Sequence, residues 1–183
     1  MSQEKDFTPY FQQWIDNYAD DIRLLISLLK EKSAPEELRR LVVGTLNYGL
    51  KQLDLIPDFY TPVGLIDDAM IIRVFAKIGL DYVLQLENEN LRNKLIQLAE
   101  EDKFINEFVG DDIYRALTNY VKAQPDRKVR QRDAKIVLGN DDIMKEFIDD
   151  IKGELSGYEG AKISDPVNVQ KDLKSFLKLK LVG

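Results

Sequence analysis

Four aspartates between residues 54 and 68 are the residues whose type and spacing could do chemistry. The chain of 183 residues contains no His and no Cys, which excludes Ser-His-Asp triads, thiolate nucleophiles and metal sites with imidazole or cysteine ligands. Carboxylates remain, and their oxygens suit Mg²⁺ or Ca²⁺. The candidate site therefore consists of Asp54, Asp58, Asp67 and Asp68.

The spacing of apolar residues after these aspartates predicts that Asp67 and Asp68 point inward or sideways. In a helix, Asp67 shares a face with Ile71 and Asp68 shares a face with Phe75. An inward carboxylate needs partners, because an unpaired buried charge costs several kcal/mol.

Asp54 and Asp58 sit across a turn that contains Pro57 and Pro62, and they could approach the same point. We favour a structural role, in which the acids accept N–H hydrogen bonds from the turn and from helix N-termini and fix the fold of the segment. Two alternatives remain: a Mg²⁺ or Ca²⁺ site, which lacks the spacing of an EF-hand loop, and a docking site for a partner's Arg or Lys.

The same segment resembles the YkvA-like family, a bacterial domain of unknown function numbered 1232. The resemblance implies a two-helix hairpin over about residues 35–82, and it implies no settled activity. Many members look hydrophobic enough to be membrane-associated, but Lys51, Arg73 and Lys77 interrupt the apolar helices here, so we expect no membrane insertion. The residues that carry the resemblance are Asp54, Leu55, Ile56, Pro57, Asp58, Phe59, Pro62, Gly64, Asp67 and Asp68.

The helices that must position these residues follow from apolar residues at steps of three and four. A first helix begins at Thr8-Pro9, and a second begins at Ser33 with a capping box formed with Glu36. A third, from about Pro62 or Leu65 to Leu86, is apolar nearly all round and should be central. Its polar stripe is expected to contain Arg73, Lys77 and Asp81.

Further helices are expected downstream. Their ranges are 89–108, with a break at Asp102, then 111–123, 126–138, 141–155 and 166–180, the last capped by Asp165. The fold class is therefore all-α: a single-domain bundle of seven or eight helices over residues 1–183 with a central apolar hairpin at 35–82. A boundary near residue 110 is a weaker alternative.

The net charge of −6 argues against a nucleic-acid partner, although residues 122–135 carry +4. Residues 141–154 carry −4, and we expect the two segments to pack together. The basic segment 171–180 could lie on an anionic membrane, but docking of a terminal helix on the bundle is favoured.

These observations predict a non-catalytic interaction or scaffold module that binds an unknown protein partner or makes peripheral membrane contact. The charges along the chain leave no membrane-spanning segment, and the N-terminus has no leader pattern, so we expect a cytoplasmic protein, with peripheral membrane attachment as a variant. We expect no cofactor and no enzymatic activity. The alternative is an enzyme that uses Mg²⁺ or Ca²⁺ on Asp54, Asp58, Asp67 and Asp68.

Overall fold

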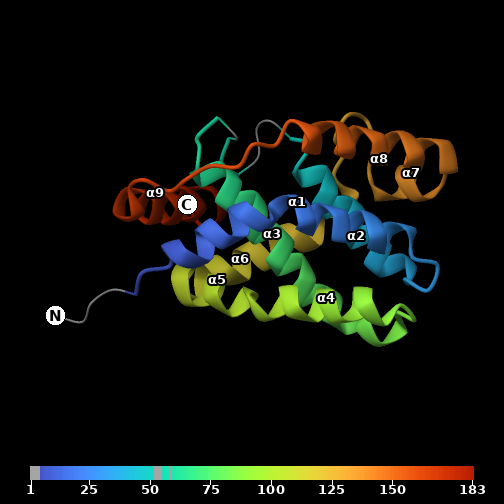
Figure 1. The fold of residues 1–183 in the computed structure, drawn as a ribbon, viewed down its shortest axis with the longest axis horizontal. Coiled ribbons are helices and arrows are strands. Elements are labelled where there is room, and N and C mark those ends of the chain that lie inside the picture. Colours follow the sequence, from blue (N-terminus) through green and yellow to red (C-terminus); the bar gives the residue numbers. More distant parts are fainter. Residues whose placement is uncertain (1–4, 52–54, 58) are drawn as a thin grey trace.

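The computed structural model describes residues 5–51, 55–57 and 59–183, and over these residues the protein is all-α, as predicted (Figure 1). Eight α-helices have eight or more residues, which agrees with the seven or eight expected, and one further helix is short. The α-helices are α1 (Thr8–Lys30), α2 (Glu36–Tyr48), α3 (Val63–Gly79), α4 (Glu89–Glu100), α5 (Asp102–Val109), α6 (Asp111–Ala123), α7 (Ala134–Leu138), α8 (Asp141–Ser156) and α9 (Pro166–Leu181), and the 3₁₀ segments are η1 (Leu80–Gln85) and η2 (Gln124–Asp126).

Helix α3 runs through the middle of the bundle, as its apolar composition predicts (Figure 1). It packs against α1, α2, α4, α5, α6 and α9. Its α-helical conformation ends at Gly79, and the last part of the expected helix is the 3₁₀ segment η1. The expected polar stripe is also wrong at one position, because Arg73 is only 1% exposed.

The apolar stripe of α1 enters the same core. Phe11, Trp14 and Leu25 are completely buried, because steps of three and four residues keep them on the face that meets α2 and α3. The core continues to Leu173 and Leu177 of α9. Docking of the basic terminal helix on the bundle is therefore confirmed.

Two predicted helix starts have different outcomes. The capping box at Ser33 is wrong: α2 begins at Glu36 after Pro35, and the Ser33 hydroxyl donates to Glu31 and accepts from the backbone N–H of Glu87. The predicted cap of α9 is confirmed, because the Asp165 carboxylate accepts from the backbone N–H of Asn168 at 3.2 Å.

The expected helix over 126–138 is wrong in its first half. Residues 127–133 form a loop, in which Val129 and Arg132 make a two-residue bridge, and only Ala134–Leu138 is helical. The expected break at Asp102 is confirmed, because α4 ends at Glu100 and α5 begins at Asp102. Asp102 is buried and accepts a hydrogen bond from the Tyr114 hydroxyl.

Among the described residues, no helix combines the length and the apolar character that crossing a bilayer requires.

Candidate functional site

Asp67 and Asp68 lie near the start of α3, and both are buried, as the helical spacing predicts. Asp67 is 0% exposed and Asp68 is 7% exposed. Asp54 and Asp58 lie outside the described residues. The approach of Asp54 and Asp58 to Asp67 or Asp68 therefore stays a prediction.

The Asp67 carboxylate is held by a tyrosine at the end of the preceding helix. The Tyr48 hydroxyl, at the last residue of α2, donates to Asp67 Oδ2 at 2.5 Å and accepts from the backbone N–H of Leu55 at 3.2 Å. One hydroxyl therefore joins α2, the turn and α3. The sequence analysis missed Tyr48, and the signal that could have found it is a tyrosine closing an apolar helix just before the turn.

Asp68 points to a different place, the wall of a surface cavity of about 180 Å³. The cavity lies between α1, α2, α3 and α8, and the segment after α8 closes it. Among the described residues that line it, the charged ones are Asp68 and Glu154, and Tyr18 and Tyr158 add hydroxyl groups. The apolar walls are formed by Ile22, Leu46, Leu50, Leu65, Ile151 and Leu155.

Tyr18 and Tyr158 form the aromatic side of this cavity. Their ring centroids are 5.0 Å apart, and the Tyr158 hydroxyl donates to the backbone carbonyl of Ile15 at 2.7 Å. Burial raises the pKa of Tyr158, and the negative charge of Asp68 raises it further, so this hydroxyl stays protonated at neutral pH. Gly49 completes the wall: a Cβ atom there would lie 2.9 Å from the Tyr18 hydroxyl, so a larger residue would displace the ring.

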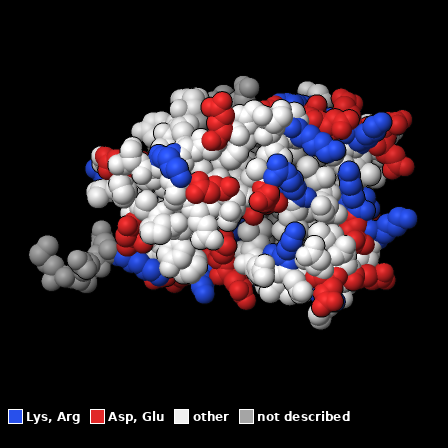
Figure 2. Space-filling model, viewed as in Figure 1, with Lys and Arg blue, Asp and Glu red and all other residues white. Residues whose placement is uncertain are grey.

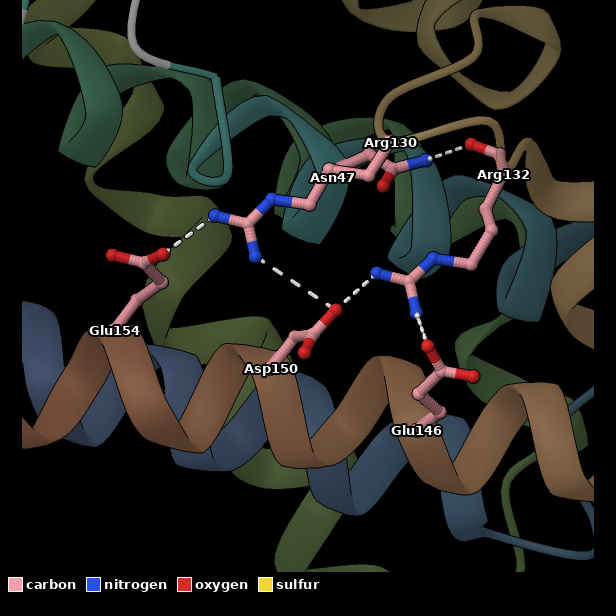
Figure 3. Close-up of polar contacts among 6 residues, drawn as sticks. All are labelled: Asn47, Arg130, Arg132, Glu146, Asp150 and Glu154. Carbon is pink, nitrogen blue, oxygen red and sulfur yellow. Dashed lines mark hydrogen bonds and ion pairs between the residues drawn. The ribbon is translucent and has the colours of Figure 1, made fainter.

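Glu154, the second acidic residue of the cavity wall, belongs to an ion-pair network (Figure 3). Arg130 Nη2 lies 2.6 Å from Glu154 Oε1, and Arg130 Nη1 lies 3.8 Å from Asp150. Arg132 pairs with Asp150 and, at 3.7 Å, with Glu146. The basic segment and the acidic helix α8 therefore pack together, as predicted.

This network is also tied to α2. Asn47 Nδ2 donates to the backbone carbonyl of Arg132 at 3.0 Å (Figure 3). Because α2 and α8 both line the cavity, the loop over 127–133 fixes two of its walls relative to each other.

A second charged centre lies around Arg73, which the sequence analysis placed on an exposed stripe. Its guanidinium is 2.9 Å from Asp21 and 2.7 Å from Glu101, and it lies 4.9 Å from the centroid of the Trp14 ring. Burial raises the pKa of the Asp21 carboxyl to about 6, with Arg73 acting against the rise. This cluster joins α1, α3 and the junction of α4 with α5, so its role is structural.

In the part of the chain that the structure describes, no group of three or more His, Cys, Asp or Glu side chains is placed to hold a metal ion. Asp67 is bonded to Tyr48 and Asp68 faces the cavity, so the two consecutive carboxylates do not share one surrounding.

Comparison with known families identifies the segment that contains these aspartates. Residues 39–73 match the model of a family described as a protein of unknown function (DUF1232). The match covers part of α2, the turn and the first part of α3, and it includes Asn47, Tyr48, Asp67, Asp68 and Arg73. No curated protein and no solved structure matches the chain.

Proposed function

We propose that the protein is a non-catalytic interaction module and that its cavity beside Asp68 receives a Lys or Arg side chain of a partner protein. The observation that carries the proposal is the buried carboxylate of Asp68 in the wall of a cavity that is otherwise mostly apolar.

The chemistry of the walls suits a side chain with an apolar stem and a cationic end. Leu46, Leu50 and Leu65 would contact the methylene groups, which Lys and Arg bury readily. Asp68 would meet the charge in a place of low dielectric constant, where an ion pair is stronger than in water. The rings of Tyr18 and Tyr158 offer additional cation–π attraction.

The site supports binding better than catalysis. The Tyr158 hydroxyl, which has a raised pKa and donates to a backbone carbonyl, is a poor general base. The proposed function uses no cofactor and places the protein in the cytoplasm. Nucleic acid is not the proposed partner, since Arg130 and Arg132 of the 127–133 loop are already paired with acidic residues of α8.

The test is an NMR titration of the ¹⁵N-labelled protein with N-acetyl-lysinamide and N-acetyl-argininamide, using N-acetyl-norleucinamide as the neutral control. We expect saturable shifts of the Gly49, Leu50 and Gly157 amides with the two cationic amides only, at dissociation constants of the order of 1 mM. Shifts that are equal for the neutral amide, or no shift at the cavity, would contradict the proposal.

Variants separate the cavity from general surface charge. Asp68→Asn should weaken binding of the cationic amides about tenfold, since an ionic hydrogen bond is replaced by a neutral one. Asp112→Asn removes an exposed carboxylate from α6, which does not line the cavity, and should leave binding unchanged. Equal losses in both variants would show attraction to the acidic surface instead of binding in the cavity.

A titration with MgCl₂ and CaCl₂ tests the competing enzyme hypothesis on Asp54, Asp58, Asp67 and Asp68. The interaction module requires no saturable shift of amides in α3 with either ion. Saturable metal binding that is lost in Asp67→Asn would contradict the proposal and would indicate a metal-dependent site instead.

A further inference from the structure

A second surface, at the end of the molecule where α9 lies, combines exposed basic and apolar side chains in an otherwise acidic protein. We propose that the outer face of α9, together with the neighbouring turn at Phe59 and Tyr60, binds the surface of an anionic lipid membrane. This inference uses no residue of the cavity and stands independently of the proposed function.

The charge of this surface is the first argument. Residues 166–183 carry a side-chain charge of +3 in a chain whose net charge is −6. The four lysines of α9 are all exposed, whereas Asp172 is half-buried and faces the Tyr60 hydroxyl at 3.4 Å. A cluster of exposed lysines on an acidic protein is complementary to anionic headgroups. The lysines are Lys171, Lys174, Lys178 and Lys180.

Exposed apolar residues lie beside these lysines. Leu179 is 68% exposed and Val182 is 51% exposed, both at the end of α9. Phe59 is 79% exposed, and the ring of its neighbour Tyr60 packs against Phe176 of α9 with centroids 5.0 Å apart. The pairing of basic and apolar side chains on one surface is typical of helices that lie in the membrane interface.

The space-filling view compares the charged groups at the two ends of one face (Figure 2). Acidic and basic side chains crowd the end where α2, α7 and α8 lie, and fewer charged groups of either sign are visible at the end where α9 lies (Figure 2). The end that would meet the membrane therefore exposes fewer acidic groups on this face than the opposite end does.

Helix α9 can present this face without leaving the protein. Its inner side is held by Val169, Leu173 and Leu177, which are buried against the core, and it packs against α3 and α6. The geometry points to attachment parallel to the membrane surface, with the bundle remaining folded.

Co-sedimentation with lipid vesicles tests the inference on the full chain. We expect binding to vesicles of phosphatidylcholine mixed with phosphatidylglycerol, weak binding to pure phosphatidylcholine, and loss of the difference at high salt. Failure to sediment with either lipid, or equal binding to both, would overturn it.

Paired variants identify the surface. Lys178→Glu and Leu179→Ser should each lower the partition coefficient for the anionic vesicles about tenfold. The matched controls are Lys32→Glu, on the turn after α1, and Leu84→Ser, where Leu84 is 88% exposed in η1. Circular dichroism verifies that all four variants fold. Losses as large in the controls as in α9 would also overturn the assignment.

Discussion

Asp67 and Asp68 are consecutive residues of one helix, yet their side chains lie in different surroundings. Successive residues of an α-helix point about 100° apart, so Asp67 meets the Tyr48 hydroxyl while Asp68 reaches the cavity. The Tyr48–Asp67 hydrogen bond thus links α2 to α3, and Asp68 lies in the wall of the cavity.

The ion-pair cluster around Arg73 contains a largely buried carboxyl group, that of Asp21, whose pKa is raised. Because burial raises the pKa of Asp21 from 3.8 to about 6, the folded protein binds the proton more tightly than the unfolded chain does. The stability contributed by protonated Asp21 is therefore fully present below pH 3.8 and is lost as the pH rises through about 6.

Asp21→Asn should remove this pH dependence. From pH 5 to pH 7.5, we expect the free energy of unfolding of the variant to rise by about 1 kcal/mol relative to the native chain, since Asn does not titrate. Urea unfolding at the two pH values measures this change. The control is Asp112→Asn, which removes an exposed carboxylate of α6 that pairs with Arg115 outside this cluster and should leave the pH dependence due to Asp21 in place. A constant difference for Asp21→Asn would contradict the assignment.

The inward orientation of Asp67 and Asp68 could be predicted because it depends only on the period of one helix. Their partners could not, since Tyr48 and the residues of α8 reach the site through the fold. Arg73 shows the same limit: helical spacing marks it as polar but does not reveal that Asp21 and Glu101 of other helices surround it.

Helix α2 packs closely against η2, the 3₁₀ segment that follows α6. Gly44 faces the backbone of η2, where a Cβ atom would lie 2.6 Å from the nitrogen of Pro125. The glycine is therefore required by close packing of α2 on η2, and this contact supports the loop that carries Arg130 and Arg132.

Gly44→Ala should destabilise the protein by about 1–3 kcal/mol, the usual range for overpacking a close contact. Gly153→Ala is the matched control in α8, since a Cβ atom there would meet nothing within 4 Å. It should stabilise by about 0.5–1 kcal/mol through helix propensity. Thermal or urea unfolding measures both, and a neutral Gly44→Ala would show that the backbone of η2 moves away freely.

The loop after η2 explains why one predicted helix failed while most others were confirmed. Arg130 and Gln131 adopt positive φ angles of 49° and 66° in the tight turn between Val129 and Arg132. Asn-Gly is the sequence that most strongly favours a two-residue turn of this kind. Arg-Gln carries no such signal, and the charged residues around it suit an exposed helix equally well. The conformation is held by contacts with α8 and Asn47, which local sequence does not encode.

Over the whole molecule, the charges are arranged by segment. The acidic helix α8 is partly neutralised by Arg130 and Arg132, whereas the lysines of α9 face outward. The proposed cavity and the proposed membrane surface therefore belong to different helices, and the central helix α3 packs against α9 and contributes Asp68 to the cavity.

This architecture predicts an order of local stability. Helix α3 is surrounded by six helices, so its amides at Ile71 and Val74 should exchange with solvent only on global unfolding. Among the described residues, the helices against which α9 packs most extensively are α3 and α6. Its amides should therefore exchange through a partial opening of lower free energy. Native-state hydrogen exchange at increasing urea concentration separates the two: α3 should follow the global free energy of unfolding, with α9 at least about 1 kcal/mol below it. Equal protection of both helices would mean that α9 unfolds only with the core, since no separate opening of the terminal helix would then exist.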